Sequence, residues 1–316
     1  MKIVDVTSYI NEELTSLDAL NERYHWGERN QKIFDRFLKL ESACLFPQLS
    51  LEEMLDSTLK QLLALHKDKL ASITHVMYAH SLHTTYPFEQ RTLEALVKNN
   101  ISSNTEVMSV TQGSCASSFL ALDLIECMLT RVQSDSSTPK YAILLTGDKC
   151  FHDTVQYVDQ NGLFGEGCSA SLISVDPNVP GIEVKGLTWT TLGGISHRTF
   201  KTSRQESNEY DRSFIPTMIH TIHNTLSKAQ LQPQDINTLL PYHMSPPTFD
   251  RLVDQLGIQR NRVYRKNLYA IGHCFCGDPF INLHDYWRVE NQRKHSGPIL
   301  TIAAGVAGTF SAMILS

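Results

Sequence analysis

Residues 110–119 read VTQGSCASSF and join an apolar strand to a helix through a glycine-serine turn. The residues before the turn are apolar, and the helix after it stays apolar almost all round, which predicts a buried helix. Cys115 is expected in the first turn of that helix, where unpaired backbone amides and the helix dipole favour negative charge. Such a place favours the thiolate, which is the nucleophilic form of cysteine. Cys115 is therefore a candidate nucleophile.

The alternative for Cys115 is a buried structural cysteine, because free cysteine is among the most buried residue types. Its neighbours are small enough to leave room for a group on the sulfur: Gly113, Ser114, Ala116, Ser117 and Ser118. A second reactive group is needed to decide between the two interpretations.

The composition is that of an ordinary globular protein. The 316 residues are 41% hydrophobic and 19% charged, and 28 basic against 33 acidic residues give a net charge of −5. Because the charges form no long single-sign run, a nucleic-acid partner is not expected, although a local basic patch could still bind an acidic carrier or a phosphate.

The cysteines and the apolar segments indicate where in the cell the protein is expected. Seven cysteines, an odd number without the spacing of a small disulfide scaffold, favour reduced thiols and a cytoplasmic protein. The chain opens on a strand-like segment instead of a signal peptide, and no apolar stretch approaches the length of a membrane span. We therefore expect no membrane partner.

Strand and helix patterns alternate along the chain. Strands are expected at 3–10, 73–80, 106–112, 141–146, 169–175, 182–191, 236–240, 299–304 and 310–315, and helices at 51–65, 89–97, 214–226 and 249–256. Residues 262–269 look extended, and Asp278 followed by Pro279 resembles a helix cap with a first-turn proline. This alternation predicts a layered α/β fold, with similar halves at 1–180, which carries the cysteine, and 181–316, which carries two histidines.

His243 and His273 are the candidate partners of the cysteine. His243 follows a buried strand, and strand ends in α/β sheets are where ligand sites gather; the alternative is a structural histidine, since the chain has 13. His273 lies in AIGHCFCG, residues 270–277, which also raises the possibility of a metal site. Paired C-x-x-C knuckles are missing and adjacent residues rarely point at one ion, so we expect no metal and no cofactor.

One cysteine and two imidazoles together suit acyl transfer. The thiolate accepts an acyl group, and the imidazoles donate hydrogen bonds to a carbonyl oxygen or move protons. A glycine turn before the last strand, residues 305–308, offers amides for an oxyanion.

Five segments in order resemble motifs of the thiolase superfamily, and specifically of β-ketoacyl-acyl carrier protein synthase III. They are GSCA at 113–116, GLFGEGCSA at 162–170, LPYH at 240–243, GHC at 272–274 and GVAGTF at 305–310. Each motif alone is weak, but together they cover nearly the whole chain. The resemblance implies a layered αβαβα fold of two duplicated halves and a homodimer.

The resemblance also implies roles for individual residues. Cys115 would carry the acyl group, His243 would be the catalytic histidine, and the amides of Cys115 and Val306 would form the oxyanion hole. Tyr86 and Phe88 lie where the family lends a tunnel-end aromatic to its partner subunit. The implied reaction takes an acyl group from acyl-CoA or an acyl-carrier protein and condenses it with a malonyl-type thioester.

Departures from the family pattern leave alternatives open. His273 stands where synthase III has asparagine, which gives a Cys-His-His set that can still stabilise an enolate. The segment that grips coenzyme A is not recognisable, with Trp26 and Arg29 only faint candidates. This favours a carrier-protein donor and a specialised-metabolite pathway. Two alternatives remain: acyl transfer without decarboxylation to an oxygen, nitrogen or carbon nucleophile of a small-molecule acceptor, and a catalytically silent subunit of a heterodimer.

Overall fold

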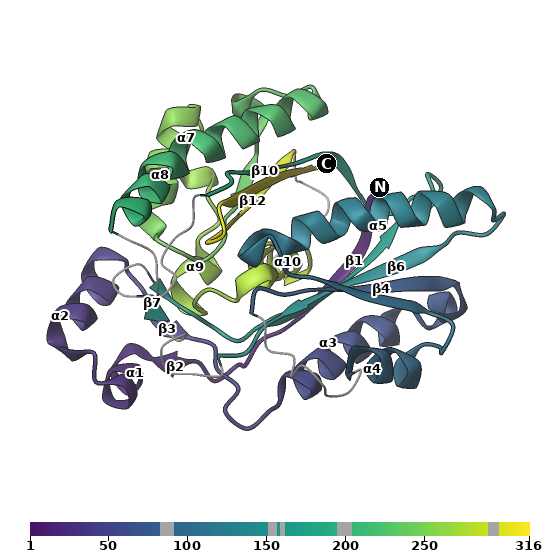
Figure 1. Cartoon of the computed structure of the whole chain (residues 1–316), viewed down its shortest axis with the longest axis horizontal. Helices are drawn as coiled ribbons and strands as arrows, with labels where there is room; N and C mark the ends of the chain where they lie inside the picture. The colour runs from purple at the N-terminus through teal and green to yellow at the C-terminus, as the bar shows by residue number, and fades with distance from the viewer. Residues whose placement is uncertain (83–91, 151–156, 159–161, 195–203, 290–296) are drawn as a thin grey trace.

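The computed structural model describes all residues except 83–91, 151–156, 159–161, 195–203 and 290–296 (Figure 1). The first part contains β1 Lys2–Tyr9, β2 Thr15–Ser16, α1 Leu17–Tyr24, α2 Gly27–Lys32, β3 Ser42–Ala43, α3 Leu51–Leu65, β4 Ile73–Ala79, α4 Thr92–Asn100, β5 Glu106–Val110, α5 Ser117–Ser134, β6 Tyr141–Gly147, β7 Tyr157–Val158, β8 Gly162–Leu163 and β9 Cys168–Ser174. The second part contains β10 Ile182–Thr191, α7 Arg204–Ala229, β11 Thr238–Leu240, α8 Pro246–Leu256, α9 Lys266–Ala270, α10 Asp278–His284, β12 Ile299–Gly305 and β13 Thr309–Leu315.

The main sheet has nine strands in the order β11-β12-β13-β10-β1-β9-β6-β4-β5. β4 pairs parallel with β6, and the next two pairs, β6 with β9 and β9 with β1, are antiparallel. In the same way β11 pairs parallel with β12, and the pairs β12 with β13 and β13 with β10 are antiparallel. The two groups of strands thus repeat one run of pairings, and they meet where Lys2 and Ile3 pair with Glu183 and Ile182.

Helices lie on both sides of each group of strands, which gives the five layers expected of the fold. Figure 1 shows α5 and α10 between the strands of the first part and those of the second. Phe119 of α5 and Phe280 of α10 belong to one buried cluster with residues of β1, β4, β6, β12 and β13. Separate clusters join α3 to the outer face of the first group and α7 and α8 to that of the second.

Local sequence explains several element boundaries. The side chain of Ser50 accepts from the amide of Glu53, and the side chain of Glu53 accepts from that of Ser50, so a capping box starts α3. Gly257 ends α8 in the left-handed conformation, which glycine adopts easily. The prediction of an extended segment at 262–269 was wrong over residues 266–269, which lie in α9, whereas Val263 has extended backbone and bridges Leu239. α7 starts at Arg204, earlier than expected, and contains Pro216.

Residues 17–45, where no strand or helix was expected, form most of a separate buried cluster that also includes Leu163. Trp26 belongs to this cluster and packs edge-on against Phe34 with ring centroids 4.9 Å apart. In the part of the chain that the structure describes, no helix is long and apolar enough to cross a membrane.

Candidate active site

Cys115 lies on a tight elbow between β5 and α5. A 3-10 turn, Ser114–Ala116, precedes α5, so the cysteine stands just before the first turn of the helix and not in it as predicted. Ser114 has φ 51°, a left-handed conformation that a non-glycine residue adopts at an energetic cost. The sulfur is buried, with 5% of the residue exposed. The elbow therefore fixes the direction of the thiol.

Two other segments hold this elbow in place. A Cβ added to Gly305, at the end of β12, would lie 2.1 Å from the carbonyl oxygen of Gly113, so only glycine allows this close approach. The Sγ of Cys276 donates a hydrogen bond of 3.1 Å to the carbonyl of Ser114. Val306 directly follows Gly305, which packs on the elbow. The role of the Val306 amide in an oxyanion hole with the Cys115 amide stays a prediction.

His273 connects the thiol to a carboxylate. Its Nδ1 hydrogen-bonds Asp278 Oδ2, and the ring lies close enough to Cys115 for the charge of the sulfur to act on it. Its backbone is fixed by a bond of 2.8 Å to Leu163 O. Burial disfavours a charged imidazole, but the negative charges of Asp278 and Cys115 outweigh it and raise the pKa of His273 to about 10.

Asp278 is the functional residue that the sequence pattern misassigned. It was expected to cap a helix, but α10 begins at Asp278 itself and its carboxylate accepts from the amides of His243 at 2.6 Å and Cys274 at 2.7 Å. Burial alone would raise the pKa of this carboxyl, yet the charges of His243 and His273 hold it well below its usual range. A signal was present in the sequence, since an aspartate lies five residues after the histidine.

His243 lies on the other side of Asp278. Its Nδ1 is 3.0 Å from Asp278 Oδ1 and 3.0 Å from the carbonyl oxygen of Gly272, and its Nε2 is 3.0 Å from Asn282 Oδ1. Both ring nitrogens are therefore engaged away from the sulfur. The contacts run from Cys115 through His273 to Asp278, with His243 behind the carboxylate.

The surroundings of the sulfur are apolar. Cys115 clusters with Phe164 and Phe275, and the half-buried Leu82 and Cys150 pack against them. The rings of Phe164 and Phe275 stack at 4.6 Å, and that of Phe164 lies 5.1 Å from the His273 ring. Such walls suit a hydrocarbon chain on the thiol and exclude water.

A second buried carboxyl supports this wall. Asp148 accepts hydrogen bonds of 2.9 and 3.1 Å from the amides of Ser81 and Leu82, and so anchors the segment that carries Leu82. Burial raises the pKa of Asp148 to about 7. Asp148 thus positions an apolar side chain without touching the sulfur.

Comparisons with known proteins agree with this architecture. Residues 226–316 match the family described as 3-oxoacyl-[acyl-carrier-protein] synthase III C terminal. ChlB3, an acyltransferase, superposes with a TM-score of 0.83 at 15% identity, covering 100% of this chain and 97% of that one. Over its whole length the chain shares the fold of this acyltransferase, and residues 226–316 resemble synthase III. It has the thiolase-like fold, and the predicted fold class is confirmed.

Two further structures extend this finding. The 3-oxoacyl-[acyl-carrier-protein] synthase III of Aquifex aeolicus superposes with a TM-score of 0.80 at 17% identity, covering 99% of each chain. OleA of Xanthomonas campestris gives 0.78 at 14% identity, covering 99% of this chain and 97% of its own. No curated protein sequence matches the chain. At these identities the structures establish the fold of the chain, and its chemistry has to be argued from its own residues.

Some residues singled out from the sequence have other positions. Trp26, a faint candidate for binding coenzyme A, is buried in a hydrophobic cluster formed mainly by residues 17–45. Tyr86 and Phe88 lie outside the described residues.

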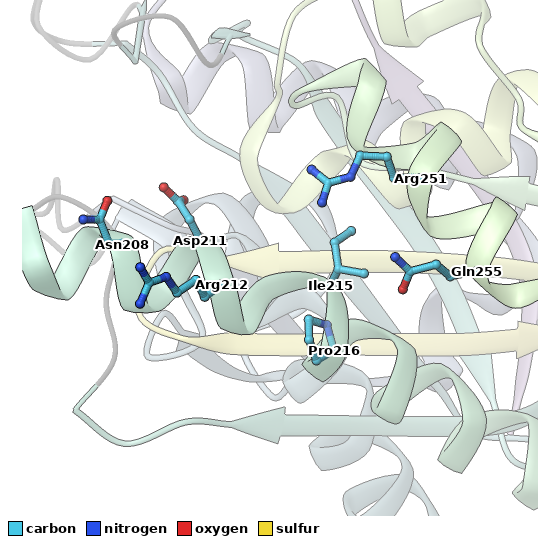
Figure 2. A pocket seen from close by; sticks show the side chains of 7 residues that line it. All are labelled: Asn208, Asp211, Arg212, Ile215, Pro216, Arg251 and Gln255. Carbon is cyan, nitrogen blue, oxygen red and sulfur yellow. The ribbon is translucent and has the colours of Figure 1, made fainter.

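A polar pocket of about 500 Å³ lies between α7 and α8 (Figure 2). The residues that line it are Asn208, Asp211, Arg212, Ile215, Pro216, Arg251 and Gln255. Tyr210, beside this pocket in sequence, is buried and donates a hydrogen bond of 3.3 Å to Gly305 O, next to the elbow. Burial raises the pKa of Tyr210, and the charge of Cys115 adds to this effect. The pocket therefore adjoins the helix turn that faces the cysteine.

Proposed function

We propose that the protein is an acyltransferase that loads an acyl group from a CoA or carrier-protein thioester onto Cys115 and passes it to a second substrate. The observation that carries this proposal is the chain of contacts from Cys115 through His273 to Asp278 beside an apolar wall. A thiol, an imidazole and an orienting carboxylate are the parts that nucleophilic acyl transfer needs. The acyl chain would lie against Phe164 and Phe275.

In the loading step the Cys115 thiolate attacks the thioester carbonyl of the donor. The carbon–sulfur bond of the donor breaks, and the His273 imidazolium protonates the departing thiolate, which leaves as a free thiol. A buried imidazolium is suited to this role because Asp278 and Cys115 raise the pKa of His273. The products are a Cys115 thioester and a neutral His273.

In the transfer step the neutral His273 acts as the base. It removes the proton from an acceptor hydroxyl, amine or carbon acid, and the acceptor attacks the Cys115 thioester. The bond from the acyl carbon to Cys115 breaks, which regenerates the thiolate beside the imidazolium. Asp278 keeps the ring oriented in both steps.

Transfer without decarboxylation is favoured over condensation by the position of His243. A decarboxylating site uses two donors at one carbonyl oxygen, whereas both ring nitrogens of His243 have other partners. Condensation with a malonyl-type thioester is the second candidate. It is supported by the match of residues 226–316 to the synthase III C-terminal family and by the two imidazoles in one network.

The two candidates differ in one product. Enzyme acylated on Cys115 is mixed with malonyl thioester labelled in its free carboxyl group, and separately with alcohol and amine acceptors. We expect acyl transfer to an acceptor and no labelled carbon dioxide. Release of labelled carbon dioxide in step with loss of the acyl group would establish condensation instead.

We further propose that the pocket between α7 and α8 receives the phosphate of the donor, on coenzyme A or on the carrier's phosphopantetheine. It offers the guanidinium groups of Arg212 and Arg251, and guanidinium binds phosphate in a two-pronged geometry. Arg251→Gln should raise KM for the donor by about tenfold with little change in kcat, because a phosphate contact is equally strong throughout the reaction. Arg260→Gln is the matched control, since Arg260 bonds Asp254 outside this pocket. An unchanged KM in Arg251→Gln would refute this assignment.

The exposed edge of the main sheet is the basis of the proposed quaternary structure. β5 is the last strand of the main sheet, and Met108 on it and Leu124 on α5 are 38% and 46% exposed. We infer a homodimer that covers this edge, working in the cytoplasm on a specialised-metabolite pathway. Met108→Lys should weaken the dimer in sedimentation experiments. A native protein that is monomeric and never acylates itself would instead support the silent-subunit alternative.

A further inference from the structure

In the part of the chain that the structure describes, both ring nitrogens of His243 face hydrogen-bond acceptors. Its Nδ1 faces Gly272 O and Asp278 Oδ1, each at 3.0 Å, and neither a carbonyl nor a carboxylate can donate. Nδ1 must therefore carry a proton. The ring is almost completely buried, with 1% of the residue exposed, so water cannot substitute for these partners.

The second ring nitrogen faces Asn282, whose amide orientation is fixed independently. Asn282 Nδ2 donates to the carbonyl oxygen of Pro241 at 2.6 Å, and Asn267 Nδ2 donates to Asn282 Oδ1 at 3.1 Å. Rotating the Asn282 amide would bring two oxygens together at Pro241. The atom 3.0 Å from His243 Nε2 is therefore an oxygen, which requires a proton on Nε2 as well.

We propose that Asn282 is a positioning residue that keeps His243 doubly protonated and turned away from Cys115, so that the positive charge of His243 neutralises Asp278. This inference rests on the proposed acyl transfer and deepens it. His243 then acts through Asp278 on His273 and does not contact the acyl group.

The charges of Asp278, His243, His273 and Cys115 explain how this arrangement would serve proton transfer. Asp278 has one negative charge, and the His243 cation balances it. A positive charge on His273 is then balanced by the Cys115 thiolate alone. Once Cys115 is acylated, its thiolate is gone and His273 releases its proton more easily. The imidazole is thus an acid while the donor thiol leaves and a base while the acceptor attacks.

Among the described residues, the ionisable groups that act on the two rings are Asp278 on α10, Cys115 on the elbow, Asp148 after β6 and the buried phenol of Tyr242 after β11. Burial raises the pKa of Tyr242 well above its usual value, so its phenol stays neutral, and acylation changes the charge of Cys115. Burial raises the pKa of Asp148 to about 7, so Asp148 titrates in the native protein and in each variant alike. The difference between native protein and an Asn282 variant is therefore the charge of His243, which sets how much of the Asp278 charge reaches His273.

The test follows the loss of the acyl group from preacylated enzyme across a pH series. Each sample is acylated on Cys115, desalted and mixed with acceptor, and the remaining acyl-enzyme is measured by intact mass. In Asn282→Leu, His243 loses the acceptor for its Nε2 proton and becomes neutral. Asp278 then holds the His273 proton more strongly, so the pH midpoint of transfer should rise by about one unit or more.

A control variant completes the series. Asn267→Ala removes a neighbouring bond to the same Asn282 oxygen but leaves the contact with His243, so its midpoint should stay at the native value. An unchanged midpoint in Asn282→Leu, or an equal shift in Asn267→Ala, would overturn the proposal while acylation of native enzyme still supports the acyltransferase.

A second measurement needs no substrate. In native protein labelled with ¹⁵N-histidine, the signals that disappear in His243→Gln belong to His243. Two protonated ring nitrogens at neutral pH are expected, and one bare nitrogen would overturn the proposal even if Asn282→Leu fails to fold. Absence of any acylation in the native enzyme would remove the proposed function and the inference about His273 with it.

Discussion

Two buried aspartates in this protein bind basic groups in similar ways but in very different places. Asp5, on β1, accepts from Arg288 Nε at 2.9 Å and lies 2.8 Å from His66 Nε2. Asp278 binds two imidazoles, His243 and His273. For both, burial alone would raise the pKa, and in both the bound basic groups hold it well below the usual range.

The difference lies in what each network touches. His66 and Arg288 tie β1 to the end of α3 and to the turn after α10, and both are partly exposed. The Asp278 network is fully buried and ends at the Cys115 thiol. The same electrostatics therefore stabilises the fold in one place and prepares a proton transfer in the other. A low carboxyl pKa alone does not distinguish the two; contact with a nucleophile does.

The largest effect is expected from Asp278→Asn. An amide cannot hold the charged His273 ring as the carboxylate does, so transfer from acyl-Cys115 should slow by roughly 10³–10⁴-fold. Single-turnover mass spectrometry measures this rate. Asp5→Asn is the control, because it removes the matching carboxylate far from the sulfur. Equal losses in both variants would erase the contrast between the two networks.

Asp5→Asn should instead affect stability. Arg288 and His66 would lose their buried partner, which costs about 3 kcal/mol in the free energy of unfolding, with acyl transfer per folded molecule unchanged. Urea denaturation measures the loss. Because the folded pKa of Asp5 is lowered, its contribution is present above the unfolded value of roughly 4 and declines as the pH falls. If the unfolding free energy of Asp5→Asn fell at acid pH as steeply as that of the native protein, the assignment of this pH dependence to Asp5 would be wrong.

A smaller effect is expected on the alkaline side. The pKa of His273 is raised to about 10, so its stabilisation is complete below the unfolded value of roughly 6.5 and is lost as the pH rises through 10. His273→Gln should flatten the decline in unfolding free energy over this window. A decline as steep as that of the native protein would show that other groups cause it.

The sequence predicted the strands better than the side-chain contacts around Cys115, whose role as the nucleophile stays a prediction. Strand β10 was expected at 182–191 and lies there, because alternation and β-branched residues are local signals. The extended prediction for 262–269 failed over residues 266–269, which form α9, where Asn267 makes a side-chain bond to Asn282 that the local pattern does not reveal. Asp278 was misassigned for the same reason: the direction of its side chain depends on strand ends that only the fold brings together.

Covalent acylation of Cys115 underlies all of these predictions, and the mass of the intact protein measures it. Native protein and Cys115→Ala are each mixed with a panel of acyl-CoA and acyl-carrier thioesters. We predict a mass gain of one acyl group in the native protein and none in Cys115→Ala. In Asp278→Asn the attached acyl group should persist far longer after acceptor is added. An acyl group that still attaches covalently to Cys115→Ala would contradict this prediction.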